Sequence, residues 1–371
     1  MGYRVRVLWI CPVRKRCGIA IYSNEYIKAL KMFCTVIVID CNEIAGNLSK
    51  FRKEIEQCDC VHLQYEQSLY VLNGVDYFKK ICKQINKPLI VSLHELYEKQ
   101  PGVFPREDLT GNWPTRKVKE IIYDYRHPIQ TSFRGHCKRE FYAEKIVVHH
   151  EFQRNILIDK KIESSRIKVI SHPVITFSDI RYSIAPATDR VLLLGSTGFI
   201  NPQFDYKLLF DTLDKLTLDW RFKWIGGLRR EEDCTLLNYI ESQINDRGWR
   251  DKFIITGWVE LEAQKQLLKE IDIYLALFSD RSSSDSITRA FGARRFTIGT
   301  DVPPLKEIAQ NYGALYISND SSDIVKFINE IIANVNLQNA YQEAIDKYLI
   351  QNAFPMKAHE LSLVYKEVIG L

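Results

Sequence analysis

The sequence lacks any long hydrophobic run. No apolar stretch approaches the ~20 residues that a membrane-spanning helix requires. Residues 1–10 alternate apolar side chains with arginine, so their apolar part is too short for a secretory signal peptide. Gly2 is followed by Arg6 at the position where an N-myristoylation signal has Ser or Thr. We therefore expect a cytoplasmic protein, and peripheral contact with a membrane surface stays open.

The sequence also lacks paired cysteine motifs and a large net charge. Its nine cysteines include no CxxC pair, and the two closest, Cys58 and Cys60, alternate along a predicted strand. This spacing favours packing over metal binding and fits a reducing compartment. A formal net charge of +5 is small for 371 residues. It does not favour a nucleic-acid partner, although it allows a basic patch that faces an anionic ligand.

What the sequence does contain is two successive cycles of β-rich runs and helical patterns. With 371 residues, two domains are expected, and 46% hydrophobic and 26% charged residues are typical of a globular protein. Strands that alternate with helices predict parallel strands and crossover helices, the doubly wound α/β layout. The predicted strands are 4–10, 34–40, 61–65, 88–93, 145–149 and 168–170 in the first cycle, and 191–194, 222–225, 253–255, 271–278, 296–298 and 314–317 in the second. Residues 176–190 are the predicted linker, and residues 98–140, with four prolines and many aromatics, are a predicted insert.

One stretch, residues 279–307, combines a polar run, a helix start and a basic cluster. Ser282, with Asp285 three positions later, fits a capping box beside a helix predicted over 286–292. The free N–H groups and the positive dipole end of a helix start bind phosphate. The alternative is a capped surface helix with solvated arginines. The nearby arginines are Arg281, Arg289, Arg294 and Arg295.

Loops that follow predicted strands are candidate sites, because ligands of doubly wound sheets bind beyond the carboxyl ends of the strands. The first such loop carries three consecutive cations, ending at Arg16, and then Gly18, which would let a phosphate approach the backbone. A solvated basic turn is the alternative. His94 and Glu95 follow the fourth strand, in place for acid–base chemistry or for contacts with sugar hydroxyls. The alternative is a surface turn with a histidine satisfied in the core.

Glycines recur at strand ends in the second half of the chain. Gly198, Gly227 and Gly257 each follow a predicted strand, and they fit a close approach of backbone to phosphate. The chain has no GxGxxG motif, so a dinucleotide fold gets no specific support. His149 and His150 are adjacent and point different ways, which disfavours a metal site.

These motifs, in this order, resemble those of GT-B glycosyltransferases, in particular the large retaining family 4, whose members use nucleotide-sugar donors. The resemblance covers nearly the whole chain. The matching segments are 17–23 (glycine loop and first helix), 61–66 ("VVHxQ"), 91–95 ("TxHD"), 168–174 ("KVIPNGV"), 254–259 ("xxGxV"), 271–274 ("ADxxx"), 289–292 ("EAxAxG") and 300–304 ("TDVPP").

The resemblance implies two Rossmann-like domains that face a cleft. Residues 1–178 would form the acceptor domain and 190–350 the nucleotide-sugar donor domain, while 351–371 would form a helix that packs back on the first. The implied activity is a hexosyltransferase-type glycosyl transfer with retention. It would need no cofactor and no metal, because basic side chains and a helix N-terminus neutralise the diphosphate.

The resemblance also implies roles for individual residues. His94, with Glu95 beside it, would contact or orient the donor sugar, and Glu307 would accept hydrogen bonds from the nucleotide. Arg281 and the serines after it would hold the diphosphate. The complete implied donor-binding set is Arg16, Gly18, Gly198, Asn201, Lys207, Gly227, Trp258, Arg281, Ser282, Ser283, Ser284, Asp285, Arg289 and Glu307.

Two departures from the family pattern indicate a shifted donor site. Arg281 and Arg289 stand where many members have two glutamates, and Asn201 and Phe204 stand near the usual Arg and Lys pair, for which Lys207 would substitute. The expected acceptor is a glycan, a lipid-linked saccharide or a protein, and we expect the insert 98–140 to determine its specificity. Two other classes stay open: a sugar-nucleotide-binding protein without turnover, and a glycosyltransferase that modifies nucleic acid.

Overall fold

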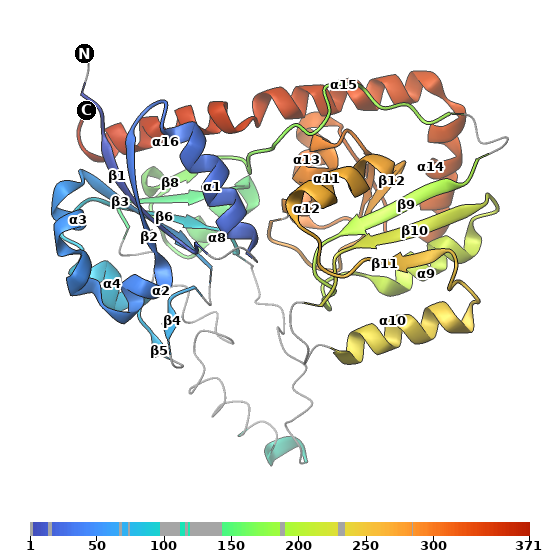
Figure 1. Cartoon of the computed structure of the whole chain (residues 1–371), viewed down its shortest axis with the longest axis horizontal. Coiled ribbons are helices and arrows are strands. Elements are labelled where there is room, and N and C mark those ends of the chain that lie inside the picture. The colour runs from blue at the N-terminus through green and yellow to red at the C-terminus, as the bar shows by residue number, and fades with distance from the viewer. Residues whose placement is uncertain are drawn as a thin grey trace. The chain divides into compact units, whose positions relative to one another are not determined.

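The computed structural model describes residues 3–13, 17–66, 69–72, 75–96, 112–115, 118, 143–185, 190–228, 234–283 and 285–371. It divides into two compact units: residues 1–171 together with 354–371, and residues 172–353. Each unit is built on a six-stranded parallel sheet with helices on its faces (Figure 1). Within the described ranges, no helix is both long enough and apolar enough to cross a membrane.

The sheet of the first unit has the order β2–β1–β3–β6–β7–β8, and all neighbours are parallel. Because strand order reverses between β1 and β3, the carboxyl ends of these strands form a topological switch point. The strands are β1 (Arg6–Cys11), β2 (Thr35–Asp40), β3 (Cys60–Tyr65), β6 (Leu89–Leu93), β7 (Lys145–Val148) and β8 (Ile167–Val169), beside a short hairpin of β4 (Val71–Leu72) and β5 (Val75–Asp76).

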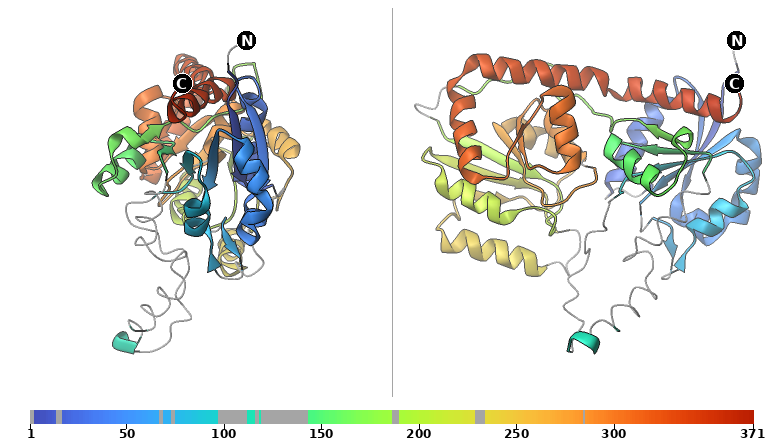
Figure 2. Two further views of the ribbon diagram at one scale, coloured as in Figure 1. Left: turned by 90° about the vertical axis from the view of Figure 1, so that its left-hand side faces the viewer. Right: turned by 180° about the vertical axis from the view of Figure 1, so that it is seen from behind.

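Two helices from opposite ends of the chain cover one face of this sheet. In Figures 1 and 2, α16 (Phe354–Val368) lies beside α1 (Gly18–Leu30). Their apolar side chains share one core with Trp9, and the Tyr26 hydroxyl donates to the Lys357 carbonyl oxygen over 3.1 Å. The other described helices are α2 (Cys41–Gly46), η1 (Leu48–Phe51), α3 (Arg52–Gln57), α4 (Phe78–Gln84), α8 (Glu151–Asp159) and η4 (Ser164–Arg166).

The sheet of the second unit has the order β11–β10–β9–β12–β13–β14, so its switch point lies between β9 and β12. The strands are β9 (Leu192–Thr197), β10 (Trp220–Ile225), β11 (Phe253–Ile255), β12 (Ile273–Ala276), β13 (Phe296–Gly299) and β14 (Tyr316–Ile317). The helices are α9 (Tyr206–Lys215), α10 (Cys234–Asp246), α11 (Leu261–Glu270), α12 (Asp285–Gly292), α13 (Pro303–Tyr312), α14 (Ser321–Ala333) and α15 (Val335–Gln351).

The predicted doubly wound layout is confirmed, and each predicted strand has a counterpart whose ends differ by a few residues. The segment 300–304, which matches "TDVPP", runs into a helix, because Pro303 and Pro304 form the first turn of α13. Proline is well suited to this position, where the missing N–H would have no intrahelical partner. The insert 98–140 lies almost wholly outside the described residues.

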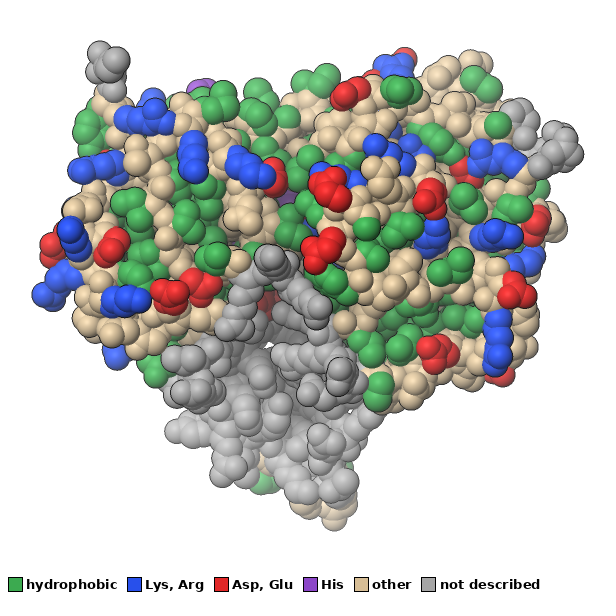
Figure 3. Space-filling view, in the orientation of Figure 1, with side chains coloured by type: hydrophobic (Ala, Val, Ile, Leu, Met, Phe, Trp, Pro, Cys, Tyr) green, Lys and Arg blue, Asp and Glu red, His purple; other side chains and the backbone are tan. Residues whose placement is uncertain are grey.

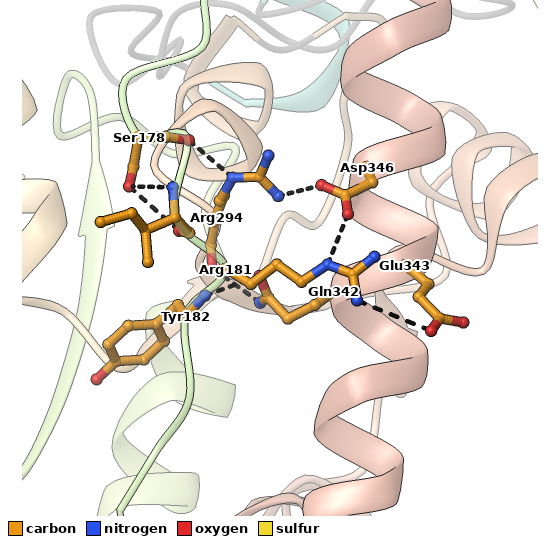
Figure 4. Close-up of polar contacts among 8 residues, drawn as sticks. Ser178, Arg181, Tyr182, Arg294, Gln342, Glu343 and Asp346 are labelled. Atoms are coloured by element: carbon orange, nitrogen blue, oxygen red, sulfur yellow. Dashed lines mark hydrogen bonds and ion pairs between the residues drawn. The ribbon is translucent and has the colours of Figure 1, made fainter.

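Residues 174–184, which we call the strap, belong to the second unit and pack against the rest of it, although the sequence predicts a linker over 176–190. Figure 4 shows how the strap is held. The Arg294 Nε donates to the Ser178 carbonyl oxygen over 2.7 Å, and Arg294 also pairs with Asp346 on α15. Arg181 of the strap pairs with the same carboxylate over 2.7 Å. Partial burial acts to raise the pKa of Asp346, but the two guanidinium groups hold it below its ordinary value.

The first residues of the strap also form backbone hydrogen bonds with other parts of the second unit. The Val174 N–H donates to the Asn352 carbonyl oxygen over 2.8 Å, and the Phe177 N–H to that of Gly292 over 2.7 Å. A Cβ atom added to Gly292 would lie 2.1 Å from the Ile175 carbonyl oxygen. The glycine that ends α12 is therefore required by the close passage of the strap.

Candidate functional site

The polar loop after β12 lies at the switch point of the second sheet, together with the loop after β9. The two loops are joined by backbone contacts. Phe204 and Phe278 form an antiparallel bridge, and the Ser279 N–H donates to the Gln203 carbonyl oxygen over 2.8 Å. Residues about 75 positions apart thus form one structural unit at the place where doubly wound sheets bind their ligands.

Arg281 is held within this pair of loops. Its Nη1 donates to the Gln203 Oε1 over 2.9 Å, and its guanidinium carbon lies 5.0 Å from the centre of the Phe278 ring. Its Nε is buried and has no hydrogen-bond partner among the described residues. A buried N–H without an acceptor is costly. A phosphate oxygen that reached this nitrogen would form a charge-assisted hydrogen bond with it.

The residues after Arg281 lead into α12. Ser282 is fully buried and Ser283 is half-buried, while Ser284 lies outside the described residues. α12 begins at Asp285, one residue before the predicted start. The predicted capping box is wrong, because Ser282 as its N-cap would require Asp285 to be the third residue of the helix, whereas Asp285 is the first residue of α12.

Arg289, in contrast to Arg281, is neutralised by a carboxylate of its own helix. It forms an ion pair with Asp285 one turn earlier and also donates to Gln264 on α11. Burial acts to raise the pKa of Asp285, but the charges of Arg289 and His172 outweigh it and hold that pKa below its ordinary value. Asp285 therefore stays ionised near neutral pH and neutralises Arg289. Arg281 forms no ion pair within the described part of the chain, so it is the cation of this loop left to bind an anion.

Tyr274 links the two strands of the switch point, β12 and β9, through a buried hydroxyl. Its side chain, 1% exposed, comes from β12, and its hydroxyl lies 3.0 Å from the Thr197 Oγ1 and 3.2 Å from the Thr197 N, which donates to it. Burial raises the pKa of Tyr274, so the hydroxyl stays neutral. The end of β9 is thereby fixed next to the loop that carries Arg281.

The glycines at the strand ends have two different roles. A Cβ atom on Gly226 would lie 2.1 Å from the Gly198 carbonyl oxygen, and one on Gly227 would lie 3.1 Å from the Cα of Gly257. These two glycines are required by close approach of one loop backbone to another. Gly198 differs, because its φ of 118° demands glycine while a Cβ atom there would meet nothing within 4 Å. Gly198 therefore has open space beside it at the switch point, where a ligand would fit.

In the first unit, four polar side chains are buried on or directly after β3 and β6: His62, Gln64, Ser92 and His94. The His94 Nε2 lies 2.9 Å from the Gln64 Oε1, and the ring packs edge-on against Tyr22 with 4.9 Å between centroids. His94 is 8% exposed, whereas the neighbouring Glu95 is exposed. The buried, hydrogen-bonded His94 next to an exposed Glu95 agrees with the alternative of a surface turn with a histidine satisfied in the core, so burial alone does not give His94 a functional role.

The structure brings some of the predicted donor residues together and not others. Arg281 and Ser283 lie in the loop after β12, and Gly198 and Asn201 lie in the loop after β9, which is joined to it. The amide group of Asn201 serves its own loop: its Nδ2 donates to the Phe199 carbonyl oxygen over 2.8 Å and its Oδ1 accepts from the Gln203 N–H over 2.9 Å.

The remaining predicted residues lie elsewhere. The Lys207 ammonium is highly exposed on α9 and pairs with Asp211 over 2.5 Å, which raises the pKa of Lys207. Glu307 is on α13, after β13, and Trp258, at the end of β11, stacks on Phe199 with 5.7 Å between ring centroids. Gly18 is the exposed first residue of α1, and Arg16 lies outside the described residues.

Two residues of the site were missed by sequence reasoning. Gln203 holds Arg281, and Tyr274 supports the end of β9. Gln203 gave no signal, since its partner lies 78 positions away. Tyr274 had a weak one, because a tyrosine in an otherwise aliphatic buried strand requires a partner for its hydroxyl.

No protein-family model and no curated protein matches the sequence, but solved structures match its fold. A glycosyltransferase from Rickettsia africae ESF-5 is 16% identical, with a TM-score of 0.70 over 99% of both chains. Alr3699/HepE of Anabaena, in complex with UDP-glucose, is 13% identical, with a TM-score of 0.66 over 98% of this chain and 100% of that one. Sucrose-phosphate synthase from Thermosynechococcus elongatus is 12% identical, with a TM-score of 0.67 over 99% of this chain and 100% of that one.

These similarities extend over both units, and the sheets of both units have doubly wound orders. The predicted fold is therefore confirmed: the chain has the GT-B fold of these structures, with two Rossmann-like units.

Proposed function

We propose that this chain is a glycosyltransferase that takes its sugar from a nucleotide-diphosphate sugar. The fold supports the proposal, since it is shared with a glycosyltransferase from Rickettsia africae and with Anabaena HepE, which has been solved with UDP-glucose. Fold alone does not determine function, so the proposal depends on the site in the second unit.

The observation that carries the proposal is the buried, unpartnered Nε of Arg281 at the switch point, among the described residues. Three neighbouring features suit a diphosphate there. Ser283 is half-buried in the same loop, and the start of α12 follows directly, with its N–H groups and positive dipole end. Gly198, with open space beside it, lies on the adjoining loop.

The proposed role of Arg281 in the reaction follows from where negative charge develops. When the bond between the sugar and the diphosphate breaks, negative charge grows on the leaving nucleoside diphosphate, and a fixed cation stabilises it. We assign this role to Arg281, so the proposed reaction needs no metal and no cofactor. We further propose hexosyl transfer with retention, with His94 in the first unit as a contact of the donor sugar. The stacked rings of Phe199 and Trp258 offer a surface for the nucleotide base.

The proposed acceptor is a glycan, a lipid-linked saccharide or a protein. The insert 98–140 is the proposed source of acceptor specificity. For a lipid-linked acceptor, the proposal includes peripheral contact with a membrane surface from the cytoplasmic side.

The test is a thermal-shift panel of UDP-, GDP-, ADP- and dTDP-sugars with the wild type and Arg281→Ala. At a hundredfold excess over Kd, a ligand stabilises the folded state by ~2.7 kcal/mol, which is readily measured. One nucleotide class should raise the Tm of the wild type. Loss of a charge-assisted hydrogen bond costs roughly 1.5–3 kcal/mol, so Arg281→Ala should bind that nucleotide about 10- to 100-fold more weakly.

Two further variants separate a diphosphate contact from a general loss of charge. Arg281→Lys keeps the charge but loses Nε, so we expect intermediate binding. Arg221→Ala removes an exposed arginine of β10 and should bind like the wild type. Absence of a shift with every nucleotide sugar would contradict the proposal. Equal binding by the wild type and Arg281→Ala would contradict the assignment of the diphosphate to Arg281.

Two further assays, of nucleotide release and of DNA binding, distinguish the two other functional classes. A protein that only binds sugar nucleotides would show the shift but release no nucleoside diphosphate when acceptors are added. An enzyme that modifies nucleic acid would bind DNA with a strong dependence on salt concentration. On the face shown in Figure 3, basic side chains are interspersed with acidic and apolar ones, which is not typical of a surface that binds nucleic acid.

A further inference from the structure

The candidate residue His94 is the outer end of a buried chain of polar side chains in the first unit. His62 and Gln64 are fully buried on β3, and Ser92 is 1% exposed on the neighbouring β6. The His62 Nδ1 lies 2.7 Å from the hydroxyl of Tyr365 on α16, and the His62 Nε2 lies 2.8 Å from the Ser92 Oγ. Gln64 joins the two histidines, with its Nε2 3.2 Å from the His62 Nε2 and its Oε1 2.9 Å from the His94 Nε2.

The register of the sheet explains this alignment. Gln64 pairs with Ser92, and since side chains alternate along a strand, His62, Gln64 and Ser92 lie on the same face as the core residues Cys60 and Ile90. That face is covered by α1 and α16. Buried polar groups must pair with one another to avoid a desolvation penalty, and these side chains do so.

The donors and acceptors in this chain determine where the protons lie. Burial, with a smaller contribution from His94, lowers the pKa of His62 to about 3, so His62 is neutral and has one N–H. The Gln64 Nε2 only donates, hence the His62 Nε2 accepts and its proton is on Nδ1, facing Tyr365. The Gln64 Oε1 only accepts, hence the His94 Nε2 carries a proton and donates to it.

We propose that Gln64 is a positioning residue that holds His94 as the Nε2–H tautomer, with its lone pair on Nδ1. One amide group thereby assigns opposite tautomers to two histidines: His62 accepts through Nε2 and His94 donates through Nε2. The same bond, together with the edge-on packing against Tyr22, orients the His94 ring. The part that His94 takes in sugar transfer rests on the proposed function, whereas its tautomer does not.

The tautomer is read directly by long-range ¹H–¹⁵N NMR of the full chain with labelled histidine, with His94→Gln to identify the His94 signals. In the wild type we expect a protonated Nε2 and an unprotonated Nδ1 on His94. Gln64→Met keeps the volume but removes both hydrogen bonds, so His94 should divide between its two tautomers. Gln64→Glu keeps an acceptor for His94 and should restore the Nε2–H form.

Ser92→Ala is the matched control, because it removes a bond to His62 but none to His94, so it should leave the His94 signals unchanged. An Nδ1–H tautomer of His94 in the wild type would overturn the proposal. An unchanged His94 tautomer in Gln64→Met would overturn it too. Thermal unfolding of each variant checks that the first unit is folded.

Activity provides a separate readout. With the nucleotide sugar identified by the binding panel, Gln64→Met should lower kcat/KM for nucleotide release about 10-fold or more, because a misplaced catalytic group costs up to about 10²-fold. Gln64→Glu should recover part of that loss. If the spectra agree but no sugar nucleotide binds, the proposed function fails and the tautomer assignment stands. If a sugar nucleotide binds but the spectra disagree, the tautomer assignment fails and the proposed function stands.

Discussion

Gly292→Ala is expected to destabilise the second unit by ~3 kcal/mol or more. The added methyl group would lie 2.1 Å from the Ile175 carbonyl oxygen, a distance that requires the backbone of the strap to move. Movement of the strap would also weaken the bond from the Phe177 N–H to the Gly292 carbonyl oxygen, now 2.7 Å long. Overpacking alone costs about 1–3 kcal/mol, and loss of a backbone hydrogen bond adds to it.

For a unit of this size, such a loss lowers the Tm by roughly 6–12 °C, which calorimetry would resolve. Gly18→Ala is the matched control, because a Cβ atom there meets nothing within 4 Å and its φ lies outside the left-handed region. That variant should keep the wild-type Tm to within a few degrees. A Gly292→Ala protein as stable as the wild type would mean that the strap can move without lowering the free energy of unfolding, which would contradict the prediction.

Acidification is the second change with a large expected effect. The pKa of His62 is about 3 in the folded chain, whereas its ordinary value is 6.5. Between pH 6.5 and pH 3 the unfolded chain therefore binds a proton at this position that the folded chain does not. Stability is lost as the pH falls through this range, by ~1.4 kcal/mol for each pH unit, and no loss from this group occurs above pH 6.5.

Urea unfolding of the wild type and His62→Gln across this pH range measures the effect. The variant should be less stable near neutral pH, but its free energy of unfolding should fall less steeply with pH, by the equivalent of about one proton. His359→Gln, at an exposed position of α16, should keep the wild-type slope. If the variant is too unstable to study, the NMR signals of His62 in the wild type decide: protonation near pH 6 in the folded state would contradict the expectation.

The strands were predictable because their apolar, β-branched runs are local properties of the sequence. That the loops after β9 and β12 lie together was predictable too, since carboxyl ends of parallel strands share one edge of a sheet. Gly198, Arg281 and Ser283 follow β9 and β12, and the topology brings them to the switch point.

The pairings of the site residues could not be predicted, because each depends on contacts between distant segments. The sequence does not distinguish Arg281 from Arg289. Gln264, on α11, helps to hold Arg289, while the Nε of Arg281 is left without a partner among the described residues. Likewise, the pattern that suggested glycines for phosphate includes Gly227, whose lack of a side chain allows the close approach of the Gly257 backbone.

The first unit is discontinuous, with residues 354–371 completing what residues 1–171 begin. During synthesis residues 1–171 leave the ribosome before residues 354–371, so the core around Trp9 and Tyr26 is completed only when Leu361 and Tyr365 of α16 have emerged. The second unit, residues 172–353, emerges whole in the meantime and has a complete core of its own. The unit that begins first is thus the last to finish folding, and a nascent chain would keep the α16-facing side of its first sheet exposed to chaperones until residues 354–371 have emerged from the ribosome.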